Sequence, residues 1–231
     1  GQAGGNGVPV TGAVPGRNTT GLPWWLLGSA TQYDTRQDQA KLKLAYDITP
    51  LLRASYTLGW WQNDSQGRPE SWLRDGAGNA VYSGPVLIGG RTVTLAPTAF
   101  PLTDDRQTHV MHGLSLKSRT QGEWDWELAA SLYDYARDRQ RAPTVALPQA
   151  ASGGPGTLQS QDGTGWNTLA AKGTWRPQGL QGAHIVDFGL GRDAYRLGID
   201  KINVIGSWVD GPGNPQSAVS NVGGRTETAY L

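Results

Sequence analysis

Apolar and polar residues alternate one by one along six stretches of this chain, and the connections between those stretches are alternately short and long. Such alternation is typical of a β-strand with one apolar face, because successive side chains point to opposite sides of a sheet. Helical periodicity is nearly absent. The pattern predicts an all-β chain built from antiparallel hairpins.

The first hairpin illustrates the pattern. Leu42, Leu44 and Tyr46 alternate with polar residues, and after a connection that contains Pro50 the alternation resumes at Ala54. Two further pairs of stretches and a strand-like tail follow the same rule. We expect about seven strands, near residues 38–47, 53–61, 107–118, 123–135, 166–176, 183–194 and 225–231.

The lengths of the connections narrow the fold further. Short turns are expected at 48–52, 118–122 and 177–182, and long Gly- and Pro-rich connections at 62–106, 136–165 and 195–224. Compact soluble domains rarely carry several such long connections, whereas outer-membrane barrels have short periplasmic turns and long extracellular loops. We therefore predict an antiparallel transmembrane β-barrel segment over 37–231, preceded by an extracellular loop segment, 1–36. A small hairpin, 81–88 against 91–95, is expected inside the first long loop.

Hairpin register provides a consistency check, because residues that face each other share a face of the sheet. Centring each short turn pairs Leu44 with Tyr56, Leu114 with Trp126, and Ala171 with Phe188. Every hairpin then has one apolar and one charged face. We expect the apolar face to contact outer-membrane lipid and the charged face to line an enclosed interior.

Tryptophan placement agrees with a membrane barrel. Trp124, Trp126 and Trp175 lie beside the short turns, and Trp60 and Trp61 lie at the opposite strand ends. Aromatic girdles of this kind occur at both membrane interfaces. The alternative is that these side chains fill a soluble core, where each buried indole N–H needs a hydrogen-bond partner.

Composition excludes several other classes. No stretch reaches the roughly 20 consecutive apolar residues that a transmembrane helix requires. The formal net charge is only +1, which gives no signal for nucleic acid. Cysteine is absent, so a disulfide framework and thiol catalysis are excluded. Gly1 and Leu231 look like cuts through a longer protein.

No motif predicts an enzyme, a cofactor or a metal site. Gly189-Leu-Gly191 matches part of a dinucleotide fingerprint, but no helix pattern follows it, so strand glycines are the better interpretation. Glu123, Asp125 and Glu127 share a strand face and are expected to be interior charges rather than glycosidase acids. His109 and His112 are expected on opposite faces, which disfavours a shared metal.

Ligand contacts, if present, are expected from aromatic and basic residues in the loops, since these types are enriched at binding sites. The candidates are Trp72, Arg74, Tyr82, Trp166 and Trp208. The alternative is that these residues only pack the loops together.

Several runs resemble the barrel strands of TonB-dependent receptors. They are Asp38 to Pro50, Arg53 to Gly59, Glu123 to Tyr135, and Gly223 to Leu231. The resemblance implies a barrel of about 22 strands in the Gram-negative outer membrane, closed by a plug domain and energised through TonB. It implies uptake of a scarce nutrient, such as an iron–siderophore complex, cobalamin or a carbohydrate. This chain shows neither a plug nor a TonB box.

Three other functions stay open at this point. A soluble all-β carbohydrate-binding module would need evenly short connections. A secreted all-β hydrolase would need two carboxylates with separated pKa values in a cleft. A passive porin-type barrel would have the same wall but no plug.

Overall fold

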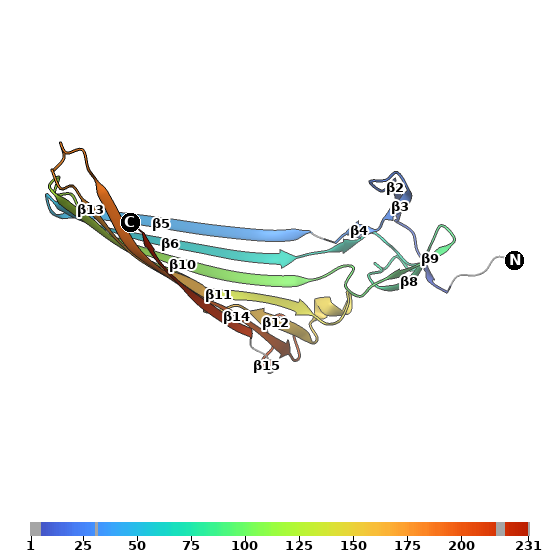
Figure 1. Ribbon diagram of the computed structural model, residues 1–231. Helices are drawn as coiled ribbons and strands as arrows, with labels where there is room; N and C mark the ends of the chain where they lie inside the picture. The colour runs from blue at the N-terminus through green and yellow to red at the C-terminus, as the bar shows by residue number, and fades with distance from the viewer. Residues whose placement is uncertain (1–5, 31, 216–219, 231) are drawn as a thin grey trace.

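The computed structural model describes residues 6–30, 32–215 and 220–230, and its main feature is one antiparallel sheet of nine strands. Seven strands are long: β5 (Tyr33–Thr49), β6 (Leu52–Gly67), β10 (Thr103–Ser118), β11 (Trp124–Pro143), β13 (Gly165–Trp175), β14 (Val186–Val204) and β16 (Ser220–Tyr230). Two are short: β12 (Gly156–Ser160) and β15 (Gly213–Pro215). Figure 1 shows the long strands side by side in one curved, twisted layer.

Each long strand pairs with the next long strand along the chain, as in a series of hairpins. β13 is shorter than its neighbours, and beyond its end β12 pairs with both β11 and β14. Within the described residues the sheet ends at β5 on one side and at β16 on the other, so it does not close into a barrel. The predicted all-β class and the antiparallel order of strands are confirmed.

A small lobe lies beyond the far ends of β5, β6 and β10 (Figure 1). Its strands are β1 (Val8–Pro9), β2 (Val14–Arg17), β3 (Pro23–Leu26), β4 (Gly28–Ser29), β7 (Glu70–Ser71), β8 (Gly84–Ile88) and β9 (Arg91–Leu95). β8 and β9 form the predicted hairpin, turning through Gly89 and Gly90, whose φ angles of 55° and 80° suit glycine. One short 3-10 helix, η1 (Gln149–Ser152), precedes β12, and no helix among the described residues is long and apolar enough to span a membrane.

The strands extend well past the predicted bounds at the end distant from the short turns. β11 continues to Pro143 and β14 to Val204, and β5 already begins at Tyr33, inside the segment expected to be loop. The long connections are therefore shorter than predicted. Apolar alternation stops before the ladders do in β5, β6, β10 and β11, whose extensions are mostly polar on both faces, whereas the extension of β14 also contains Leu197, Ile199, Ile202 and Val204. The predicted last strand is β16, and Leu231 lies outside the described residues.

The register of the first hairpin is confirmed, with Leu44 opposite Tyr56. The other two registers were wrong by an even number of residues: Leu114 pairs with Ala130, and Ala171 pairs with Leu190. Even shifts keep every side chain on its predicted face.

Wider turns explain both register shifts. In the second turn, the backbone N–H groups of Thr120 and Trp126 donate to the side chains of Asp125 and Ser118, at 2.6 and 2.7 Å. In the third, the N–H of Gly179 donates to the carbonyl of Arg176 at 2.9 Å, and the N–H of Gly182 donates to the carbonyl of Gly179 at 3.2 Å. These turns use residues that a tight, centred turn would have placed in the strands.

The apolar face of the large sheet is bare. Leu44, Leu128 and Leu190 expose 56%, 48% and 65% of their surface. The buried hydrophobic residues lie elsewhere, in the lobe, in the loops and at the far ends of strands, and the largest buried cluster is Leu73, Val86, Ile88 and Leu95. Among the described residues, no second layer of protein covers the leucines of this sheet.

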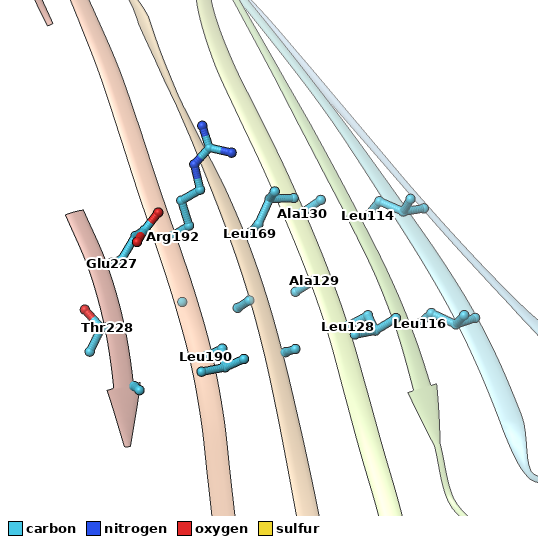
Figure 2. A pocket seen from close by; sticks show the side chains of 14 residues that line it. Leu114, Leu116, Leu128, Ala129, Ala130, Leu169, Leu190, Arg192, Glu227 and Thr228 are labelled. Atoms are coloured by element: carbon cyan, nitrogen blue, oxygen red, sulfur yellow. The ribbon is translucent and has the colours of Figure 1, made fainter. Parts of the chain in front are cut away.

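The upper edge of the apolar face runs obliquely across the strands, where "upper" means distant from the short turns. In one cross-strand row, Leu44 on β5 and Leu114 on β10 share their row with Arg192 on β14 and Glu227 on β16. Figure 2 shows Leu114, Ala130 and Leu169 in this row giving way to Arg192, while Leu116, Leu128 and Leu190 in the row below are all apolar. The last apolar residues before polar ones are Ala40, Trp60, Val110, Leu132, Leu169, Leu190 and Ala229, in strand order from β5 to β16.

Aromatic rings cover strand glycines directly across the ladder. Phe188 faces Gly173, and Tyr230 faces Gly189, each ring occupying the space that a Cβ on the glycine would need. This arrangement fills the gap left by a residue without a side chain. It also accounts for Gly189, which lies within β14 as the strand-glycine interpretation predicted.

Candidate functional site: an aromatic cluster on the charged face

Five aromatic side chains gather on the charged face of the sheet, from four neighbouring strands. They are Trp61 on β6, His109 on β10, Tyr133 and Tyr135 on β11, and Trp166 on β13. The rings of His109 and Tyr135 are stacked with centroids 3.8 Å apart, and those of Tyr133 and Trp166 with centroids 4.3 Å apart. Trp61 approaches His109 at 5.0 Å. We call these five residues the aromatic cluster.

A β-bulge shapes the upper border of the aromatic cluster. The register between β10 and β11 shifts by one residue between Thr108 and His109, with Ala136 as the extra residue. A bulge exchanges the faces of all residues beyond it on that strand. Asp138 therefore lies on the charged face. Without the bulge, its even position along β11 would place it on the apolar face.

Asp138 ends a chain of side-chain hydrogen bonds that crosses four strands. The amide of Gln37 donates to Asn63, that of Asn63 to Gln107, and that of Gln107 to Asp138, at 3.0, 3.1 and 3.1 Å. His109 contacts Asp138 through Nε2 at 3.0 Å and the Tyr133 hydroxyl through Nδ1 at 3.1 Å. Both nitrogens of this buried ring are thus engaged, which fixes its orientation within the aromatic cluster.

The aromatic cluster borders a hollow of about 420 Å³, whose lining includes Gln39, Lys41, Trp61, His109 and Tyr133. Trp166, at the other end of the cluster, exposes 44% of its surface. Exposed ring faces beside amide and ammonium groups suit a ligand with a flat apolar part and polar substituents. Among the described residues, no group of acidic and histidine side chains could hold a metal ion.

Asp105 lies on the same face, above the hydrogen-bond chain. Burial raises the pKa of its carboxyl, and the negative charges of Asp104 and Asp138 add to the effect. Its Oδ1 atom is buried without a hydrogen-bond partner. A hydrogen bond from Gln140 offsets part of this rise, so the Asp105 carboxyl is protonated somewhat more readily than an ordinary aspartate.

The five residues predicted from the sequence are not brought together. Only Trp166 belongs to the aromatic cluster. Trp72, Arg74 and Tyr82 lie in the lobe: Arg74 donates to the carbonyl of Leu73 at 3.0 Å, and Tyr82 packs edge-on against Phe100. Trp72 remains partly exposed there.

Trp208 lies in the loop after β14 and has a structural role. It exposes only 6% of its surface, and its Nε1 donates to the carbonyl of Ala150 at 2.8 Å. Packing of the loops, the alternative interpretation, therefore fits Trp208 and Arg74 best.

Sequence reasoning missed the other four cluster members because it assigned ligand contacts to loops. The odd or even position of each of these residues along its strand indicates which face of the sheet it occupies. Trp61 directly follows Trp60, so one of the two must face the charged side. Tyr133 and Tyr135 share odd positions with Glu127, which lies on that side. Trp61 is consequently not part of a lipid-facing girdle, contrary to the prediction.

Two of the three carboxylates considered above, Asp125 and Glu127, and also His112, have side-chain partners in the structure. Asp125 accepts from Arg176 at 2.8 Å and from the Ser118 hydroxyl at 3.0 Å, and Glu127 pairs with Lys117 at 3.0 Å. His112 lies on the apolar face, as predicted, and its Nδ1 is 2.7 Å from the hydroxyl of Tyr56.

Comparisons of the chain with protein-family models, with curated proteins and with solved structures found no match in any of the three.

Proposed function

We propose that this chain forms part of the wall of an outer-membrane β-barrel of the TonB-dependent receptor type, which takes up a scarce nutrient such as an iron–siderophore complex. The bare apolar face with its oblique upper edge is the observation that carries the proposal. In the intact receptor, the two sheet edges would pair with further strands, and a plug domain and TonB would be partners.

Exposure of the apolar face argues against the soluble alternatives. A sandwich buries the inner face of each sheet against a second layer about 10 Å away. The described residues provide no such layer, while leucine or tryptophan side chains stay exposed on five strands, β5, β10, β11, β13 and β14. A continuous apolar surface of this extent marks contact with a membrane or another protein. Lipid hydrocarbon accounts for it without a further chain.

The slope of the upper edge supports lipid over a protein partner. From Ala40 on β5 to Ala229 on β16, the edge descends by six residues over six strand-to-strand steps. At about 3.4 Å per residue and about 4.8 Å between strands, this slope corresponds to about 35°. Strands of outer-membrane barrels tilt by about 35–45° from the membrane normal. A flat membrane surface that crosses tilted strands gives an oblique edge of this kind.

The lower edge fits an aromatic girdle. Trp124 and Trp175 are stacked at 5.6 Å beside the short turns, and Phe188 contacts Trp124 edge-on. All three lie on the apolar face. Indole rings favour the membrane interface because they are apolar in body and carry one polar N–H.

A shallow hollow of about 800 Å³ on the apolar face is consistent with lipid contact. Leu114, Leu128 and Leu190 line it together with small residues of β13 (Figure 2). Its shape is open, and acyl chains can fill such a surface without specific recognition.

The nutrient-binding part of the proposal rests on the aromatic cluster. The charged face carries the stacked rings of the aromatic cluster beside the hydrogen-bonded amides of Gln37, Asn63 and Gln107. Such a surface, on the interior side of a barrel, can bind a ligand that enters from the end with the long loops. The Trp166→Ala substitution removes an exposed ring and should weaken ligand binding by about two- to tenfold, the usual contribution of one aromatic contact, whereas Trp24→Ala, in the lobe hairpin, should not. Unchanged affinity in the Trp166 variant would contradict this part.

Membrane partition tests the proposal as a whole. The full protein that carries this wall should sediment with outer membranes and require detergent for extraction. Recovery as a soluble, monodisperse protein without detergent would contradict it. Uptake that depends on the inner-membrane proton gradient would distinguish a receptor from a passive porin, whose conductance needs no energy source.

A further inference from the structure

The hollow beside the aromatic cluster is lined by a lysine and by no acidic residue, and we propose that it binds a flat ligand that carries an anionic oxygen group such as a carboxylate. Rings of the aromatic cluster supply the flat surfaces, and Lys41 on β5 supplies the positive charge. The inference rests on the proposed function, because it assigns a chemical class to the nutrient that the interior face would bind.

A strand glycine forms the floor of the hollow. Gly59 on β6 lies between Lys41 on β5 and Met111 on β10 in one cross-strand row. Because glycine has no side chain, the surface is recessed at this point, and Trp61 and Tyr133 border the recess. A glycine inside a strand often marks the close approach of a ligand. The volume of about 420 Å³ lies within the range of small-molecule sites.

Lys41 has no counter-charge in the chain. Within the part of the chain that the structure describes, its side chain is exposed and forms no ion pair and no hydrogen bond. By contrast, Lys117 and Lys172 on the same face each pair with a carboxylate, at 3.0 and 3.4 Å. The ammonium of Lys41 is therefore available to a ligand in the hollow.

The inward-facing residues around Lys41 include no acid. Over residues 37–45 of β5, and among the residues that pair with them on β6 and β10, the inward side carries only lysine, histidine and neutral side chains. Asp138 lies beyond this patch on β11, where it is already bound by His109 and Gln107. A recess whose charge has one sign attracts ligands of the opposite sign.

The rings and the ammonium together define the ligand. A flat ring can lie against Trp61 or Tyr133, and a carboxylate on that ring can then contact the ammonium of Lys41 across Gly59. Hydrogen bonds between charged groups are roughly twice as strong as those between neutral groups. A neutral ligand of the same shape would keep the ring contacts and lose the ionic contact. Preference for an anion over its neutral amide is therefore the expected property of this site.

Binding of two small probes to the full protein in detergent tests the proposal. The probes are indole-3-carboxylate and the neutral indole-3-carboxamide, and ligand-observed NMR titration measures both affinities against a blank of detergent alone. The wild-type protein should bind the carboxylate up to about fivefold more tightly, the usual limit for an exposed ion pair. Added salt should reduce this preference, because it screens exposed charges.

Three variants locate the site. Lys41→Gln should abolish the preference for the carboxylate, whereas Lys43→Gln should retain it. Lys43 is the matched control because it lies two residues away on the same face but outside the lining of the hollow. Gly59→Leu should abolish binding of both probes, because the leucine side chain would fill the recess.

Several results would overturn the proposal. They are equal wild-type affinity for both probes, no binding of either probe at millimolar concentration, and equal effects of the Lys41 and Lys43 variants. Unchanged probe binding in the Lys41 variant would assign its ammonium to a carboxylate of another protein segment. The wild-type comparison decides the question even where a variant misfolds. A membrane-bound protein without the anion preference contradicts this inference alone, whereas a protein that is soluble without detergent contradicts the proposed function.

Discussion

Leu114 and Leu169 lie in the same cross-strand row, but the oblique edge puts them at different membrane depths. Leu169 is the last apolar residue of β13, whereas Leu114 lies four residues below Val110, the last one of β10. Four residues on a strand tilted by about 35–40° correspond to about 11 Å of depth. Leu114 is therefore near the middle of an apolar band about 25 Å tall, and Leu169 is at its border.

Replacing each leucine by arginine should turn this difference in membrane depth into a difference in the free energy of unfolding. A lipid-facing arginine costs about 2–4 kcal/mol at the midplane of the bilayer and about 0–1 kcal/mol near the interface. We expect Leu114→Arg to lower the free energy of unfolding by about 2–4 kcal/mol and Leu169→Arg by less than about 1 kcal/mol. The two leucines have similar exposed fractions, 57% and 49%, so burial within the protein does not explain a difference.

Equilibrium unfolding of the full barrel in lipid vesicles, followed by tryptophan fluorescence, measures both values. Equal, large losses would mean that the membrane surface runs along the row, which contradicts the tilt. Changes within about 0.5 kcal/mol for both variants are typical of a water-exposed surface and would contradict lipid contact altogether.

Three further predictions concern particular residues. Asp125→Ala should lower the free energy of unfolding by about 1.5–3 kcal/mol, because it leaves charge-assisted donors at the second short turn unpaired, and denaturant titration measures the loss. Gly173→Val should cost about 1–3 kcal/mol by the same measurement, since the added methyl groups meet the Phe188 ring, and an unchanged value would contradict the described packing. In the lobe, the backbone N–H of Asn79 donates to Asp75 and holds the pKa of that carboxyl below its usual value. The stabilisation by this turn is therefore present above the unfolded pKa of about 3.9 and is lost as the pH falls through the lower pKa of the folded state. The NMR chemical shifts of the turn residues should change only below about pH 4. The Asp75→Asn substitution should abolish this change.

Much of the sheet was predictable because one face is apolar. The positions of Leu44, Leu114 and Leu169 on that face follow from two-residue periodicity alone. Register within two to four residues was not predictable, since hydrogen bonds of Ser118 and Asp125 widen a turn without changing the alternation. The strand extensions were missed for a related reason: polar pairs such as Gln37 with Asn63 continue the ladder where hydropathy no longer alternates.

The candidate site was predictable only in part. The sequence predicts Trp166 both as the start of the strand near 166–176, which is confirmed by β13, and as a ligand contact from the loops, which stays a prediction. The bulge at Ala136 decides which face Asp138, Arg137 and Arg139 occupy, and no local signal in the sequence marks it. The hydrogen-bond chain on the inner side depends on that one extra residue, because it brings Asp138 to that face.

The most direct test of the account is the environment of alternate residues along β11. The chain has no cysteine, so single substitutions can each carry one spin label. In lipid vesicles, labels at Leu128 and Ala130 should collide mainly with lipid-dissolved oxygen, and labels at Ala129 and Ser131 mainly with a water-soluble nickel complex. Labels at all four positions that collide equally with the nickel complex would contradict a wall with one side in lipid.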